Sequence, residues 1–152
     1  AFRRLEKSYR FAFSAVLTLI HDVVLVTGIY ALLGHIFGLQ VNSVFIVALL
    51  TVIGYSVNDT IVIFDRIREN QIKFPDNKYS SNINISINES IIRSLGTSIT
   101  TLLVLFSMLI LGGSTLREFI VVLILGVVVG TYSSIFIASQ FLIIWEEGIK
   151  KD

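Results

Sequence analysis

The sequence contains no cysteine, a single proline and few charged residues. Without cysteine, the chain can form neither disulfides nor thiolate metal sites. The single proline, Pro75, is consistent with long uninterrupted helices. Charged residues make up 15% of the chain, whereas soluble domains carry about 25%. Together with 54% hydrophobic residues and a mean hydropathy of +0.82, this composition indicates a membrane protein.

The residue patterns of common catalytic sites are also missing. The two histidines, His21 and His35, are too few and too far apart for a histidine-based metal site. The sequence shows no nucleophile triad and no phosphate-binding loop. We therefore expect no enzyme activity, no metal and no cofactor. A net charge of +1 gives no reason to expect a nucleic-acid partner.

Four segments are apolar enough and long enough to span a membrane, which takes about 20 residues per helix. They lie at roughly 11–33, 43–64, 95–112 and 119–144. No alternation of period two recurs over segments of about ten residues, which argues against a transmembrane barrel. The sequence thus predicts an all-α, polytopic transmembrane bundle of four spans, forming one domain over residues 1–152.

The basic residues fall almost entirely on one side of these spans. Residues 1–10, the connection 65–94 and the C-terminal tail hold eleven of the twelve lysines and arginines, and only Arg117 lies in an opposite turn. Because cytoplasmic segments carry an excess of Lys and Arg, both termini and the 65–94 connection are expected on the cytoplasmic side, or its topological equivalent.

The second span carries an ionisable residue, Asp59, about five residues and so about 7 Å from its charged end. A carboxylate in a membrane-length segment is costly and marks a functional site by default. Burial favours the neutral carboxyl group and a nearby arginine favours the ionised one, so a balanced group can carry a proton. The alternative is a structural residue that bonds between helices or reaches the interface. Polar neighbours complete this face: Ser56, Asn58 and Thr60.

Other polar residues in the spans can also have either a functional or a structural role. His21 and Asp22 lie near the middle of the first span, so at least one should face the bundle, either to handle protons or to pair with a neighbouring helix. Arg93 begins the third helix. Its guanidinium keeps its proton, so it can be a fixed counter-charge for Asp59, although the residues alone favour an interfacial anchor.

Small residues on the fourth span predict close helix packing rather than chemistry. Gly126, Gly130 and Ser134 follow one another at four-residue spacing and so share one face. Such stripes let two membrane helices approach closely.

The run 54–70 reads Gly-Tyr-Ser-Val-Asn-Asp-Thr-Ile-Val-Ile-Phe-Asp-Arg-Ile-Arg-Glu-Asn. It resembles the signature of SecF in the SecD/SecF family of protein-export membrane proteins. The resemblance continues through 10–24, which includes the His-Asp pair, through 90–103, and through Gly112-Gly113 into the glycine-rich last span. It covers essentially all 152 residues.

The resemblance implies a larger protein. Family members have six spans, with a large exported-side domain between the first two. This chain begins at Ala1, without a signal peptide, and shows four spans. We therefore expect it to be the C-terminal part of a longer six-span protein that also has two earlier spans and the exported domain.

The resemblance also implies a function. The chain is expected to act as an accessory subunit of the Sec translocase, with SecD, the SecYEG channel and SecA, and to use the proton gradient to promote export of a translocating polypeptide. The expected location is the bacterial inner membrane or an equivalent organellar membrane. Asp59 matches the proton-linked aspartate and Arg93 the arginine near it, with Asn58, Thr60, His21 and Asp22 in supporting positions.

Two other functions stay open from the residues. One is a proton-coupled small-molecule transporter of the related resistance-nodulation-division superfamily, with the polar face of the second span lining the substrate path. The other is a structural membrane scaffold, in which Asp59 would keep a single protonation state.

Overall fold

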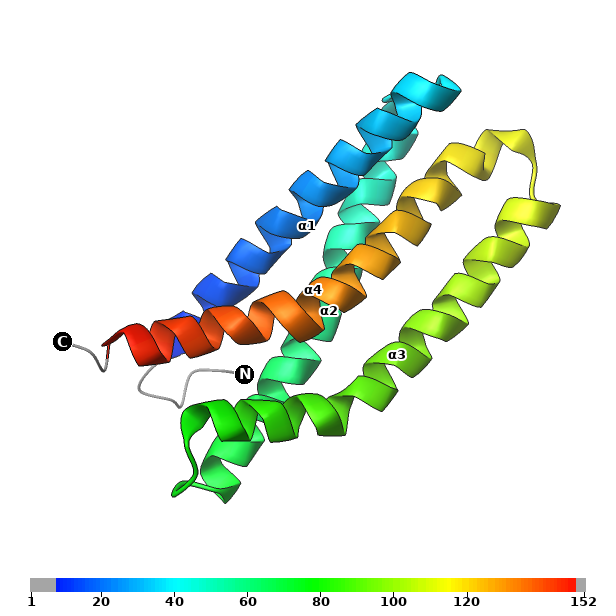
Figure 1. Ribbon diagram of the computed structural model, residues 1–152. Helices are drawn as coiled ribbons and strands as arrows, with labels where there is room; N and C mark the ends of the chain where they lie inside the picture. Colours follow the sequence, from blue (N-terminus) through cyan, green and yellow to red (C-terminus); the bar gives the residue numbers. More distant parts are fainter. Residues whose placement is uncertain (1–7, 150–152) are drawn as a thin grey trace.

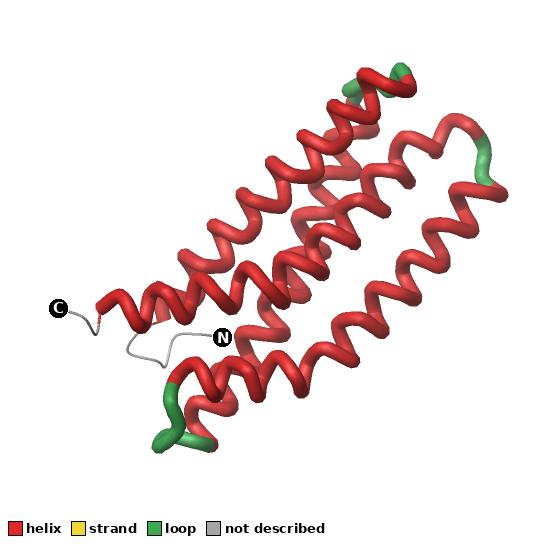
Figure 2. The backbone as a smooth tube through the Cα atoms, in the orientation of Figure 1, coloured by secondary structure: helices red, strands yellow, loops and turns green. Residues whose placement is uncertain are grey.

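The computed structural model describes residues 8–149. These residues form four long α-helices, which run over α1 (Ser8–Phe37), α2 (Ser43–Lys73), α3 (Tyr79–Leu111) and α4 (Arg117–Ile149). A short 3-10 turn, η1 (Ser114–Leu116), precedes α4. The connections are short and no strand occurs within residues 8–149 (Figure 2). The predicted all-α fold is confirmed, and all four helices are long and apolar enough to cross a membrane. Most of the basic N-terminal segment and the tail lysines lie outside the described residues.

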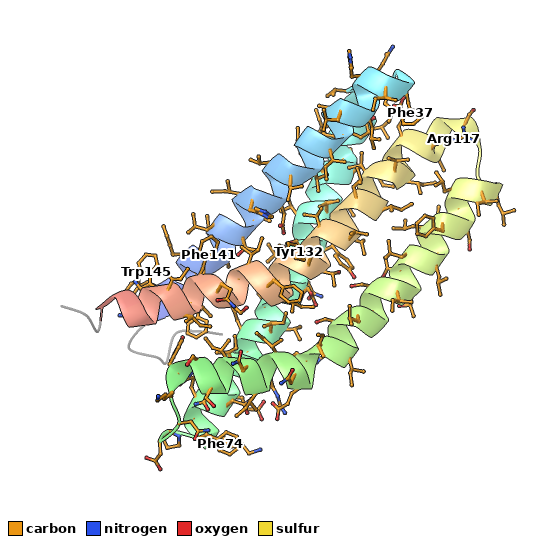
Figure 3. All side chains as sticks on the ribbon, in the orientation of Figure 1. Phe37, Phe74, Arg117, Tyr132, Phe141 and Trp145 are labelled. Carbon is orange, nitrogen blue, oxygen red and sulfur yellow. The ribbon has the colours of Figure 1, made fainter. Side chains whose placement is uncertain are left out.

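Helices α2 and α4 form the centre of the bundle, and α1 and α3 flank them on opposite sides (Figure 1). Helix α4 is the most buried span and α3 the least. Because each connection is short, successive helices run in opposite directions. The start of α1, the end of α4 and the connection 74–78 therefore lie at one end, here called the basic end. Figure 3 shows Phe74 and Trp145 toward this end and Phe37 and Arg117 at the other.

The helices extend beyond the predicted spans at the basic end. Residues 65–94 connect the second and third predicted spans, and within them only residues 74–78 are non-helical. Buried amides explain the extra helix, because Asn70 Nδ2 donates to Ser86 Oγ (2.9 Å) and Asn82 Nδ2 donates to Phe74 O (2.9 Å). These bonds satisfy polar groups between α2 and the first part of α3, which runs in a different direction from the rest of that helix (Figure 1).

At the opposite end, one glycine and one asparagine set the turn between α1 and α2. Gly38 has a positive φ of 72° and donates its N–H to Gly34 O (2.8 Å), which ends α1 in a left-handed cap. Asn42 caps α2 by accepting the Phe45 N–H through Oδ1 (3.0 Å). Its Nδ2 donates to Glu118 Oε2 (2.8 Å), so the starts of α2 and α4 are tied together.

The stripe Gly126, Gly130 and Ser134 lies against α2. A Cβ at Gly126 would overlap the Val52 side chain, and a Cβ at Gly130 would lie 3.1 Å from Ser56 Cβ. One turn further, Ser134 Oγ and Thr60 Oγ1 are 2.8 Å apart. Since small side chains permit close backbone approach, the two central helices bring their hydroxyl groups within hydrogen-bonding distance.

Two apolar clusters enclose this contact. The cluster nearer the basic end includes Phe11, Phe64 and Leu142. The cluster nearer the other end includes Val26, Tyr30 and Val122. A layer of buried polar side chains lies between them, and it holds both carboxylates of the spans.

Candidate functional site

Asp59 lies on the side of α2 that faces α3. Its side chain is buried, at 8% exposure. Oδ1 accepts a hydrogen bond from Ser94 Oγ (2.9 Å). Oδ2 is buried and has no hydrogen-bond partner among the described residues. An unsatisfied buried oxygen on a charged group is costly.

Arg93 shares a small cavity with Asp59. The cavity measures about 80 Å³, and its lining consists of Tyr55, Asn58, Asp59, Val62, Arg93, Ser94 and Thr97. The two charged side chains form no direct ion pair within the described part of the chain, but Arg93 is close enough to act on Asp59 electrostatically. The exposed Arg93 therefore lies at the mouth of a cavity whose inner wall is a buried carboxylate.

A larger groove continues from this cavity toward the basic end. It measures about 490 Å³ and shares Val62 and Arg93 with the smaller cavity. Its other lining residues are mostly ionisable or polar: Ile61, Asp65, Arg66, Glu69, Glu89 and Ser90. Charged side chains thus lead from the basic end to the mouth of the Asp59 cavity.

The charged residues of this groove pair across α2 and α3. Arg66 Nε donates to Glu89 Oε2 (2.7 Å) and Nη1 to Glu69 Oε2 (2.6 Å). Asn70 Nδ2 also donates to Glu89 Oε2 (2.7 Å). Both Arg66 and Asn70 donate to Glu89, because each side chain carries donors and the glutamate only acceptors.

Asp22 lies on the other side of α2. It is fully buried and accepts hydrogen bonds through Oδ2 from Ser56 Oγ (2.5 Å) and Ser133 Oγ (2.7 Å). His21 Nδ1 lies 3.1 Å from Asp22 Oδ1. Asp22 therefore joins α1, α2 and α4, away from the Asp59 cavity.

The structure thus divides the predicted polar residues into two groups. Asn58 and Arg93 line the Asp59 cavity. Thr60 instead faces Ser134 of α4, and His21 and Asp22 meet α2 through Ser56.

The serine partners on α3 were not among the predicted site residues. Thr97, Thr100 and Ser107 donate to carbonyls of their own helix. The buried face consists of residues spaced by four: Asn82, Ser86, Ser90, Ser94 and Ser98. Of these, Ser98 contacts both Tyr55 OH (3.1 Å) and Thr131 Oγ1 (2.5 Å). The regular spacing of small polar residues was the available signal.

A family model described as "Protein export membrane protein SecD/SecF, C-terminal" matches residues 5–148. The chain belongs to the SecD/SecF family. It is 45% identical over 146 residues to a protein translocase subunit SecF from Thermobaculum terrenum, with 96% of this chain and 46% of the relative covered. It is 44% identical over 138 residues to a protein translocase subunit SecDF from Thermus thermophilus, with 91% of this chain and 18% of the relative covered.

Solved structures of SecDF show the same helical arrangement. A crystal structure of SecDF in a super-membrane-facing form superposes with a TM-score of 0.88 at 43% identity, covering 95% of this chain and 19% of that chain. A second SecDF crystal structure, from Thermus thermophilus, gives a TM-score of 0.84 at 44% identity, covering 91% and 19%. The chain spans about half the length of the SecF relatives, so it corresponds to one membrane portion of these SecD/SecF proteins.

Proposed function

We propose that this chain is the C-terminal membrane portion of a SecF-type accessory subunit of the Sec protein translocase, and that the subunit uses the proton gradient to promote protein export. It would form the last four spans of a six-span protein. The observation that carries the proposal is Asp59, whose buried and unpartnered Oδ2 lies in a cavity that Arg93 also lines.

Proton exchange at Asp59 would work through charge. A proton on Oδ2 removes the negative charge that burial penalises. Its release restores a carboxylate beside the fixed charge of Arg93, so the attraction between α2 and α3 changes with each proton. The charged groove supports a route between the cavity and the basic end. If two arrangements of α2 and α3 differ in this attraction, each protonation change would shift the equilibrium between them.

The exposed polar face supports a membrane partner. Asn58 and Arg93 are exposed in the isolated chain, although exposed polar side chains within a span are costly in lipid. Spans of SecD would cover this face, in keeping with relatives in which one protein is named SecDF. SecYEG, SecA and the translocating polypeptide would be the further partners, as members of the export machinery.

The same proposal includes a membrane location and no enzyme activity. The chain would lie in the bacterial inner membrane, or an equivalent organellar membrane, with both termini cytoplasmic. Its work would be proton-driven movement rather than enzyme catalysis, with no cofactor beyond the proton gradient.

Substitution of Asp59 by Asn in the intact protein tests the function. D59N keeps the size and the Ser94 contact but cannot ionise, so we expect loss of the proton-gradient-dependent stimulation of export, to the level without the protein. The measurement is translocation of a preprotein into inverted vesicles with and without the gradient. D76N is the matched control, because Asp76 is exposed in the 74–78 connection and lines neither the cavity nor the groove.

Co-purification of D59N with SecD shows whether the complex still forms. Full stimulation by assembled D59N would contradict the proposal and favour a scaffold. Movement of a small molecule across liposomes without Sec components would favour the transporter alternative.

A further inference from the structure

A second buried carboxylate lies outside the Asp59 cavity. We propose that Asp22 is a second proton-binding site, which exchanges its proton through His21 on the α1 and α4 side of α2. This inference deepens the proposed proton-driven function and takes its physiological meaning from that function. Its test does not depend on export.

The surroundings of Asp22 provide hydrogen bonds without a fixed positive charge. Its carboxyl group is fully buried, and the donors to Oδ2 are two neutral hydroxyls, Ser56 and Ser133. Its ion-pair partner in the described part of the chain is His21, which is charged only when protonated. A buried carboxylate without a permanent counter-charge is costly, and a proton on the His21–Asp22 pair would remove that cost.

The geometry provides a complete transfer step. The His21 side chain is 33% exposed, whereas that of Asp22 is 1% exposed. With Nδ1–H donating to Asp22 Oδ1 at 3.1 Å, His21 takes a proton at Nε2. The Nδ1–H bond then breaks as an Oδ1–H bond forms. The products are neutral Asp22 and neutral His21 in its other tautomer.

Both states keep the site hydrogen-bonded. Before transfer, Oδ1 accepts from His21, and after transfer the new Oδ1–H donates to Nδ1. Throughout, Oδ2 accepts from Ser56 and Ser133. The proton can therefore enter or leave without separating the three helices at this point.

Other ionisable groups near these contacts point elsewhere. On α2, Tyr55 OH contacts Ser98 and Asp59 accepts from Ser94, both on α3. On α4, Tyr132 next to Ser133 is exposed. Among the described residues, His21 is thus the titratable group that contacts Asp22.

A line of buried hydroxyls lies on α1 between Asp22 and the basic end. Ser14, Thr18 and Asp22 are spaced by four on α1 and all are fully buried. Thr18 Oγ1 donates to Ser14 O (2.8 Å), while Ser14 Oγ is buried without a hydrogen-bond partner among the described residues. This second polar line is separate from the groove at Asp59, because it lies on α1 rather than between α2 and α3.

Infrared spectroscopy of the intact protein in lipid vesicles tests the proposal. The background is D59N, so that Asp59 contributes no carboxyl signal. We expect the C=O band of a protonated buried carboxyl group that changes with pH between about 4 and 9, a range that covers strongly perturbed acids. The band should disappear in D59N/D22N.

A second pair of variants keeps the test valid if D22N does not fold. In the D59N background, S133A should shift the band because it removes one donor from Oδ2. S107A is the control, since Ser107 is exposed and donates to its own helix. A spectrum without such a band in D59N, or a band unchanged by both D22N and S133A, would overturn the proposal. Export is not measured, so failure of the export function would leave this result standing.

Discussion

At the residue scale, single buried side chains hold the helices together near the basic end. Asn70 is fully buried, and its Nδ2 donates to Ser86 Oγ and to Glu89 Oε2. Glu89 Oε2 also accepts a hydrogen bond from Arg66 Nε. These bonds hold the first part of α3 against α2, beside the groove that leads to Asp59. By contrast, Arg68 and Asp65 are 3.5 Å apart with Asp65 exposed, and such surface pairs contribute little.

Substitution of Asn70 by Ala should therefore destabilise the chain. It removes two buried donor contacts, one of them to a carboxylate, and we expect a loss of about 1–3 kcal/mol. The measurement is the thermal midpoint of the detergent-solubilised intact protein. N84A is the control, because Asn84 is exposed on α3. Equal midpoints for N70A and N84A would contradict the assigned role.

At the element scale, the approach of α2 and α4 decides where the polar layer lies. Gly126 faces the Val52 side chain directly, whereas a Cβ at Gly28 on α1 would meet nothing within 4 Å. The same contact brings Ser56 and Ser133 to Asp22. Close packing and polar contacts are thus consequences of one helix interface.

Substitution of Gly126 by Ala should push these two helices apart. Overpacking a well-packed contact costs about 1–3 kcal/mol, and we expect a lower thermal midpoint for G126A. The matched variant G28A should be neutral or stabilising by up to about 1 kcal/mol, because alanine favours helix over glycine. Thermal unfolding of both variants in the same detergent gives the comparison, and a G126A protein as stable as G28A would rule out the contact.

At the scale of the whole molecule, charge and helix direction set the orientation. The described residues of the basic end include Arg10, Arg66, Lys73 and Lys78, while Arg117 lies at the other end. The positive-inside rule then predicts that the basic end faces the cytoplasm. In the predicted orientation the charged groove next to Asp59 would open toward the cytoplasmic side.

The chain lacks cysteine, which makes this orientation measurable. In an intact protein without other cysteines, we expect D76C in the 74–78 connection to react with a membrane-impermeant maleimide in inverted vesicles. V41C in the opposite turn should react only from the other side. Both positions are exposed. Reversed labelling of the pair would refute the orientation.

The sequence located the main elements well because long apolar segments must become helices in a membrane. The four spans, the unusual Asp59 and the small-residue stripe of the fourth span were all visible in it. It gave the spans but not the full length of the helices near residues 65–94, since the polar composition of that connection resembles a loop. The helical state of those residues depends on bonds between Asn70 and Ser86, which are far apart in sequence.

By itself, then, the sequence determined the number of spans, their apolar character and the presence of two costly carboxylates, because these follow from composition and period alone. Only the tertiary structure decided where the carboxylates find their hydrogen-bond donors. Helix α2 separates them, with Asp59 toward Ser94 and Asp22 toward Ser56 and Ser133. The physical reason is that a buried charge must find its donors on neighbouring helices, and the packing of α2 between the others determines which helices those are.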